Sequence, residues 1–335
     1  MKILIYSPVF HPSVGGIETV ISILANEFVR QGHEVRLVTQ ISATDSKCFS
    51  FEVIRQPSWQ QLLKLIKWCD IYFQACVSLK GLLPLLIIRR PWVVTHQNWY
   101  QRVDKRVAWQ DYLKRFLANF ATNIPASFAI AEHLKAPSTV IPNPYQEDIF
   151  YEMPEIPRTQ ELIFLGRLVS DKGADLLLEA LGNLKKQGLN PKLTIVGNGP
   201  EEAKLRQQVI DLDIVEQVNF VGAKVEKELT KLLNAHKIIV VPSLWQEPFG
   251  IVALEGIACG CVVIGSEQGG LKEAIGLCGV TFPNGDVEAL TQTLLDLLTN
   301  PDKLSTYREK AESHLLSYKP ATVAKAYLQV MDKIL

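Results

Sequence analysis

The stretch Lys237-Ile-Ile-Val-Val-Pro-Ser243 is followed after three residues by Glu247-Pro-Phe-Gly-Ile-Val-Ala-Leu-Glu255. The β-branched apolar run is typical of a buried strand, and the apolar residues after Pro248 predict a helix that ends at a glycine C-cap, Gly260. Pro248 suits the first turn of that helix, because its missing N–H costs little there. A buried strand followed by a helix is the repeating unit of α/β proteins.

Two carboxylates bracket the start of this predicted helix. Glu247 would lie just before its N-terminus and Glu255 about two turns inside, on nearly the same face. Free N–H groups and the positive end of a helix dipole suit a phosphate, whereas carboxylates suit sugar hydroxyls. The combination predicts a site for a nucleotide sugar. The alternative is a surface loop with a solvated glutamate and a helix with one polar residue.

The same alternation of strand and helix runs along the chain. Strands are predicted at 2–6, 34–39, 70–74, 92–96, 127–130 and 139–141, and again at 161–165, 192–196, 218–221, 238–241 and 262–264. Helices are predicted at about 16–31 and 173–187. Prolines and acids at 142–160 predict a linker between the two series. The fold class is therefore α/β, with two Rossmann-like domains and a ligand cleft between them.

Composition and charge narrow the class of protein. The 335 residues suffice for two domains, and 35 Lys and Arg balance 35 Asp and Glu, which gives no sign of a nucleic-acid partner. Residues 1–150 hold 16 cations against 11 acids, and the remainder holds 19 against 24. The basic half is expected to meet something anionic. Six cysteines without disulfide or metal spacing, and no signal peptide, predict a cytoplasmic protein.

Glycines and cations follow several of the predicted strands. Gly15 and Gly16 open a helix after the first strand, where the backbone can approach a ligand. Arg167 and Lys172 follow the strand at 161–165 and together could neutralise a diphosphate, the alternative being two solvated charges. Gly197 starts an incomplete dinucleotide fingerprint, which disfavours NAD and suggests a base or ribose against the backbone.

Two further polar segments have both a functional and a structural explanation. His96 ends a predicted strand, at the edge where open α/β sheets bind ligands, although a lone histidine is usually structural. Asp211 and Asp213 match a metal-binding D-x-D pattern, but no strand precedes them, so solvated charges are favoured. No metal site is predicted.

In this order, the segments resemble the GT-B glycosyltransferases, specifically the retaining family 4 (glycosyl transferases group 1). The matching segments are Gly15-Gly-Ile-Glu18, His96, Pro142-Asn143, Gly166-Arg-Leu with Lys172-Gly173, Val196-Gly-Asn-Gly-Pro200, Phe220-Val-Gly222 and Glu247-Pro-Phe-Gly with Glu255. The resemblance implies two Rossmann-like domains, 1–150 for the acceptor and 151–318 for the nucleotide sugar, with a C-terminal helix at 319–335 that returns to the first domain.

The resemblance also implies roles for individual residues. The catalytic set would be His96 beside the sugar, Arg167 and Lys172 on the diphosphate, and Glu247 on the sugar hydroxyls. The other donor contacts would come from Gly15, Gly16, Gly197, Phe249, Gly250, Ile251 and, on the ribose, Glu255. The reaction would retain the anomeric configuration and need no metal and no cofactor besides the nucleotide-diphosphate sugar, with UDP favoured.

The substrates and even the class of activity have alternatives. The acceptor would be a glycan, a lipid-linked or a small molecule. A nucleotide-sugar epimerase on the same fold, or a non-catalytic nucleotide-binding protein, would share many of these residues.

Basic and aromatic residues alternate at 99–116, where Arg102, Lys105 and Arg106 precede Trp109 and Tyr112. A second basic amphipathic stretch lies at 59–68. Such segments suit a lipid-linked or phosphorylated acceptor, or an anionic membrane, here the inner face of the plasma membrane. The alternative is a helix that packs its aromatic side chains inward and leaves its cations in water.

Overall fold

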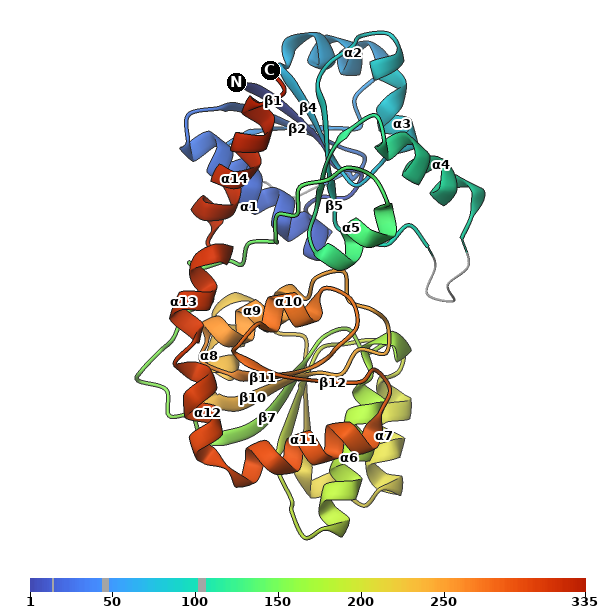
Figure 1. Cartoon of the computed structure of the whole chain (residues 1–335). Helices are drawn as coiled ribbons and strands as arrows, with labels where there is room; N and C mark the ends of the chain where they lie inside the picture. The colour runs from blue at the N-terminus through green and yellow to red at the C-terminus, as the bar shows by residue number, and fades with distance from the viewer. Residues whose placement is uncertain (14, 44–47, 102–106) are drawn as a thin grey trace. The chain divides into compact units, whose positions relative to one another are not determined.

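A computed structural model describes residues 1–13, 15–43, 48–101 and 107–335. The chain divides into two compact units, Met1–Pro144 with Tyr318–Leu335, and Tyr145–Ser317 (Figure 1). Each contains one parallel six-stranded sheet. Arg102, Lys105 and Arg106, expected to contact the acceptor or a membrane, lie outside the described residues.

The sheet of the first unit has the strand order β3-β2-β1-β4-β5-β6. Its strands are β1 (Lys2–Tyr6), β2 (Glu34–Thr39), β3 (Glu52–Arg55), β4 (Ile71–Ala75), β5 (Trp92–His96) and β6 (Thr122–Pro125). Ile3 pairs with Val35 on one side and Ile71 on the other. The chain therefore leaves β1 in one direction and later returns to its opposite side, which creates a switch point between β1 and β4.

Helices cover this sheet on both faces. They are α1 (Gly16–Arg30), α2 (Trp59–Trp68), α3 (Leu79–Leu82) with the 3₁₀ turn η1 (Leu83–Leu86), α4 (Trp109–Ala118), α5 (Phe128–Leu134) and α14 (Pro320–Asp332). The C-terminal helix α14 belongs to this unit. Tyr327 on α14 is fully buried, bonds Thr95 Oγ1 at 2.8 Å and packs its ring against Phe73.

Four short segments differ from the sequence prediction, and one of them is β6, which was not predicted. The strand predicted at 127–130 is wrong, because Ser127 caps α5 by accepting a hydrogen bond from the Ile130 N–H. The strand predicted at 139–141 is reduced to a single bridge between Ser138 and Asn123, beside β6. The edge strand β3 was not predicted; most of its residues are only half-buried, so its apolar signal is weak.

The sheet of the second unit has the order β12-β11-β10-β7-β8-β9. Its strands are β7 (Gln160–Leu165), β8 (Leu193–Val196), β9 (Val218–Gly222), β10 (His236–Val241), β11 (Val262–Ser266) and β12 (Gly279–Phe282). The last of these, β12, was not predicted.

The connecting helices of the second unit cover both faces of its sheet. They are η2 (Ser170–Lys172), α6 (Ala174–Lys186), α7 (Glu202–Asp211), η3 (Val215–Gln217), α8 (Glu226–Ala235), α9 (Ile251–Ala258), α10 (Leu271–Ile275), α11 (Val287–Thr299), α12 (Pro301–Arg308), α13 (Ala311–Leu315) and η4 (Leu316–Tyr318). One face packs on α6 and α11 in a continuous apolar core that includes Phe164, Ile195, Leu181 and Leu294.

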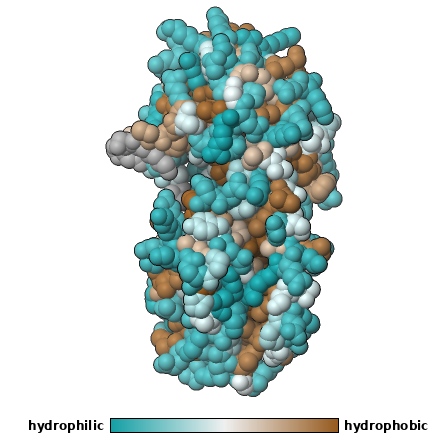
Figure 2. Space-filling model, turned by 90° about the vertical axis from the view of Figure 1, so that its left-hand side faces the viewer, coloured by the Kyte–Doolittle hydropathy of each residue, from teal (hydrophilic) through white to brown (hydrophobic). Residues whose placement is uncertain are grey.

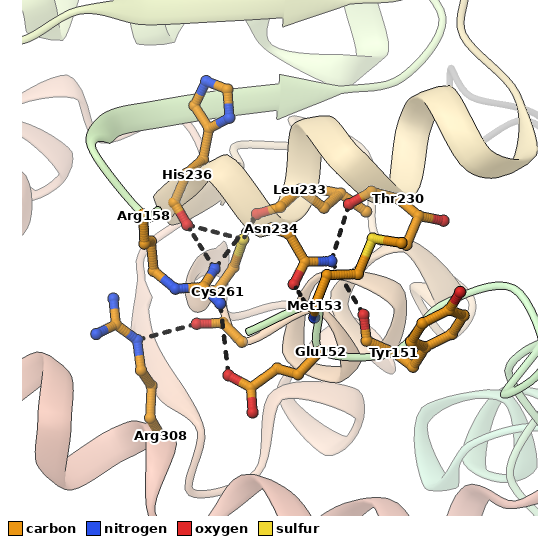
Figure 3. A network of polar contacts seen from close by, with 11 residues as sticks. Tyr151, Glu152, Met153, Arg158, Thr230, Leu233, Asn234, His236, Cys261 and Arg308 are labelled. Atoms are coloured by element: carbon orange, nitrogen blue, oxygen red, sulfur yellow. Dashed lines mark hydrogen bonds and ion pairs between the residues drawn. The ribbon is translucent and has the colours of Figure 1, made fainter. Parts of the chain in front are cut away.

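The segment predicted as a linker is fixed to the second unit through α8. Asn234 accepts a hydrogen bond from the Met153 N–H at 2.7 Å and donates to the Tyr151 carbonyl at 2.9 Å (Figure 3). Thr230 donates to the Ile149 carbonyl at 2.8 Å. These bonds explain why the second unit begins at Tyr145, some residues before the boundary expected after residue 150.

An arginine completes this attachment. Arg158 donates to the His236 carbonyl at 2.9 Å and lies 3.4 Å from Glu152 (Figure 3). Gly260, with φ +79°, leaves room for both side chains, because a Cβ there would collide with Glu152 and Arg158. The glycine predicted to close α9 therefore also serves this packing.

The surface is mixed. The face shown in Figure 2 carries mainly hydrophilic residues, with hydrophobic ones in small groups among them. Within the described ranges, none of the helices combines the length and the apolar character needed to cross a membrane.

Candidate functional site

The candidate site lies at the switch point of the second sheet. From β7 the chain proceeds through β8 to β9 on one side, and β10 is added on the other side of β7. The loops that leave the carboxyl ends of β7 and β10 therefore diverge, which is where open α/β sheets bind ligands. The β7 loop carries Arg167 and Lys172, and the β10 loop carries Ser243 and Glu247.

An ion pair joins these two loops. Lys172 Nζ lies 2.5 Å from Glu247 Oε1, and their side chains are 25% and 12% exposed, so both remain accessible. Gly173, directly after Lys172, has φ +67°, and a Cβ there would collide with the Pro242 carbonyl. The close contact of the two backbones thus places the lysine and the glutamate together.

Three further residues hold Glu247 in place. Ser243 Oγ donates to the same Oε1 atom at 2.6 Å. The Glu247 carbonyl accepts the Gly270 N–H at 2.7 Å, and Gly269, with φ +83°, avoids a collision with that carbonyl. Within the described chain Oε2 has no hydrogen-bond partner, so it is the oxygen that can accept from a ligand.

These supporting residues were not predicted from the sequence. The sequence pattern indicates Ser243 only as the end of a strand and predicts no role for Gly269-Gly270. The usable signal was a glycine pair after β11, since consecutive glycines often mark close backbone contacts.

The helix after Glu247 begins later than predicted. α9 starts at Ile251, with Gly250 at its N-cap in the left-handed region, φ +96°, where a Cβ would collide with Leu271. Pro248 is therefore outside the first turn, which corrects that expectation. Glu255 is the fifth residue of α9, just over one turn inside, so the helical argument for a shared face with Glu247 does not apply.

Glu255 is nevertheless an unusual carboxyl group. Burial raises its pKa to about 7, although the residue keeps part of its surface exposed. In the described part of the chain it has no hydrogen-bond partner. A ligand hydroxyl would supply the missing donor and favour the ionised form.

Of the remaining residues predicted to bind the donor, Arg167 can use its side chain, whereas Phe249 and Gly197 differ in how they are packed. Arg167 is exposed and, among described residues, forms no ion pair. Phe249 is 2% exposed, so its ring packs in the protein interior. Gly197, with φ +144°, lies against the Gly166 carbonyl and donates its N–H to Gly222, so backbone packing already requires a glycine there.

The first unit has a helix N-terminus at the corresponding place. Gly15 and Gly16 begin α1 directly beyond the loop that leaves β1, beside the switch point with β4. Glu18, in the first turn, accepts a hydrogen bond from Ser13 Oγ at 2.7 Å. Among the described residues no side chain caps the helix at Gly15, so its first N–H groups are suited to a phosphate.

His96 is enclosed by hydrogen bonds. Its Nε2 lies 2.9 Å from Asn123 Oδ1, and its Nδ1 lies 2.6 Å from the Tyr100 hydroxyl. The Asn123 amide nitrogen donates to the Ala118 carbonyl, which identifies Oδ1 as the acceptor and places the histidine proton on Nε2. The Tyr100 hydroxyl accepts the Val77 N–H and donates to Nδ1.

In this structure His96 offers a sugar no unbonded ring nitrogen, so its expected role beside the sugar is not supported by these contacts and stays a prediction. The residue has no exposed surface and both ring nitrogens are already bonded. Burial lowers its pKa to about 4, so the ring is neutral. The structural explanation accounts for every polar atom of the ring.

The family model for Glycosyl transferases group 1 matches residues 146–314. The chain belongs to this family. Its fold is GT-B, as predicted. The solved structure of Anabaena HepE in complex with UDP and glucose matches it with a TM-score of 0.82, at 19% identity over 99% of this chain and 100% of that one.

Curated relatives match more closely over a shorter length. Glycogen synthase of Mycobacterium tuberculosis strain H37Rv is 35% identical over 179 residues, which is 52% of this chain and 43% of the relative. Phosphatidyl-myo-inositol mannosyltransferase of Mycobacterium leprae is 27% identical over 70% of this chain and 61% of the relative. The matches thus span about half the length of these relatives.

Proposed function

We propose that this protein is a glycosyltransferase that moves a sugar from a nucleotide-diphosphate sugar to an acceptor hydroxyl. The observation that carries the proposal is the contact between Lys172 and Glu247 across the switch point, with Arg167 on the same loop as the lysine. A cation for a phosphate and a carboxylate for a hydroxyl thus lie side by side, so one ligand that carries both groups can contact them together.

Each charged group has a distinct task in this proposal. Lys172 and Arg167 bind the diphosphate and stabilise the charge that develops as it leaves. Glu247 accepts a hydrogen bond from a sugar hydroxyl through Oε2, since Oε1 is held by Lys172 and Ser243. Glu255 binds the ribose, and the N–H groups of Phe249, Gly250 and Ile251 face the phosphate and sugar.

The transfer is proposed to retain the anomeric configuration. The bond from the anomeric carbon to the phosphate oxygen breaks, and the acceptor oxygen bonds to the same face of that carbon. The acceptor proton passes to the departing phosphate. The two cations supply the charge stabilisation that a divalent metal gives in other sites, so we propose a metal-independent reaction with no cofactor.

The donor is proposed to carry UDP. HepE, which shares the fold, has been solved with UDP and glucose, and relatives are named as a glycogen synthase and a mannosyltransferase. The acceptor is proposed to be a glycan or a lipid-linked molecule. Its binding is assigned to the first unit and donor binding to the second.

An activity assay separates the proposal from its alternatives. The protein is incubated with a panel of nucleotide sugars, with and without glycan and lipid acceptors, and released nucleotide is measured. Slow donor hydrolysis that speeds up with an acceptor supports a transferase. An epimerase would convert the donor without any acceptor, and a binding protein would release no nucleotide.

A further inference from the structure

One helix of the first unit presents aromatic side chains to water. Trp109, Tyr112, Phe116 and Phe120, on α4 and the turn that follows it, are 69%, 61%, 61% and 70% exposed. Spacings of three and four residues place them along one side of the helix. The rings of Phe116 and Phe120 are in contact, with centroids 5.6 Å apart. The aromatic side chains of α4 therefore do not pack inward, contrary to the structural alternative for this part of the stretch, whereas Tyr100 at its start is buried.

A second exposed apolar group lies on the same side of the sheet. Leu83, Leu86 and Ile87, on and after η1, are 51%, 83% and 64% exposed. The partly buried neighbours Leu82, Leu85 and Ile88, and Leu117 of α4, pack against the same core cluster of the first unit. Figure 1 shows α3 and α4 on the same side of the first sheet. We call these seven exposed residues the apolar surface.

The charges around the apolar surface are nearly all positive. Lys80 and Arg89 flank the η1 segment, and Arg115 lies on α4. The sequence has no acid between Asp70 and Asp104. The acid on α4, Asp111, is 3.4 Å from Lys114 and accepts the Ala108 N–H. Its charge is therefore engaged within the helix.

We propose that the apolar surface docks on a membrane that contains anionic phospholipid. Tryptophan, tyrosine and phenylalanine favour the boundary between headgroups and acyl chains, and adjacent cations are attracted to anionic headgroups. A second copy of this chain is disfavoured, because a symmetric contact would bring the same cations together. The apolar contact comes from described residues and does not depend on Arg102, Lys105 and Arg106.

Co-sedimentation with vesicles tests the proposal. The full chain is mixed at low salt with vesicles of phosphatidylcholine alone or of phosphatidylcholine with phosphatidylglycerol. We expect it to pellet with the mixed vesicles. The double variant Trp109→Ser with Phe116→Ser should bind them at least about tenfold more weakly, since two large apolar groups are lost. Arg115→Gln should weaken binding about fivefold, the loss expected for one cation.

The matched control removes exposed apolar residues elsewhere. Val225 and Leu277, in the second unit, are 66% and 71% exposed, and their double replacement by serine should leave vesicle binding unchanged. Wild-type protein that stays in the supernatant with both vesicle types would overturn the proposal. So would equal loss of binding in the control variant, or an aromatic variant that dissociates a dimer while binding vesicles normally. The assay contains no nucleotide sugar, so its result is independent of the proposed function.

Discussion

The polar residues at the carboxyl ends of the two sheets differ in whether they keep an atom available to a ligand. In the second unit, Lys172 and Glu247 meet across the switch point and keep exposed surface and a free acceptor atom. In the first unit, His96 ends a central strand but is enclosed by Tyr100 and Asn123. A polar residue at a strand end is therefore available to a ligand only when its partners leave an atom unbonded, as the two predicted groups illustrate.

The largest effect is expected from the cations of the second unit. Lys172→Ala or Arg167→Ala should lower the rate of donor turnover by about 10²–10³, because one preorganised charge at the leaving diphosphate is lost. Nucleotide release during donor hydrolysis measures this. Lys303→Ala removes a surface lysine that pairs with Asp296 in the same unit and should turn over normally. Near-normal turnover in both site variants would remove the diphosphate assignment.

Replacing Glu255 and replacing Glu247 should have different effects on the binding of UDP and on the transfer of the sugar. Glu255→Gln should weaken the affinity for free UDP by about 10-fold or more, because a hydrogen bond to a charged group is lost. Glu247→Gln should leave UDP affinity largely intact and lower transfer. Calorimetry with UDP alone measures the first effect and donor turnover the second. An equal loss of affinity for UDP in both variants would contradict the roles proposed for the two glutamates.

Much of this site could be predicted because it depends on local sequence. Charges in the loops that follow buried strands stay near the sheet edge wherever the helices pack, so the sequence pointed to Arg167, Lys172 and Glu247. The start of α9 was misplaced because Gly250 adopts a left-handed conformation against Leu271, which lies 21 residues further along the chain. The contact of Gly269 with Glu247 is likewise non-local.

Short apolar segments were harder to assign. Residues 127–130 are apolar enough for a strand or a buried helix, and only the cap formed by Ser127 decides for α5. On α4 both Leu117 and the aromatic side chains are apolar, so the pattern could not tell which side faces the core. His96 was ambiguous because its partners Tyr100 and Asn123 cannot be paired with it from spacing alone.

His96 should contribute to stability in a pH-dependent way. Its folded pKa of about 4 lies below the ordinary value of 6.5, so the unfolded chain binds the extra proton and stability falls as the pH drops through this window. The stability advantage of wild type over His96→Gln should shrink by about 2 kcal/mol between about pH 7 and about pH 5. Urea unfolding at both pH values measures it.

The unfolding free energy of wild type must be compared with that of His96→Gln, because Glu255 changes the stability of both proteins with pH in the opposite direction. Its raised pKa adds stability as the pH falls over the same range. A stability difference between wild type and His96→Gln that stays constant with pH would contradict the buried neutral state of His96.

The smallest effect is expected at Ser243. Ser243→Ala removes one of the two donors to Glu247 Oε1, while Lys172 still holds that oxygen. Turnover should fall about 3- to 10-fold, which corresponds to one net hydrogen bond. Steady-state donor hydrolysis measures the change, and a loss as large as that of Lys172→Ala would mean that the serine contacts the substrate itself.

The central claim is that Lys172, held beside Glu247 at the second switch point, binds the diphosphate of the nucleotide. Titration calorimetry of UDP into wild type, Lys172→Ala and Lys303→Ala tests it most directly. We expect wild type and Lys303→Ala to bind equally, and Lys172→Ala to bind about 10-fold or more weakly. Binding of UDP that is the same in all three proteins would contradict the account.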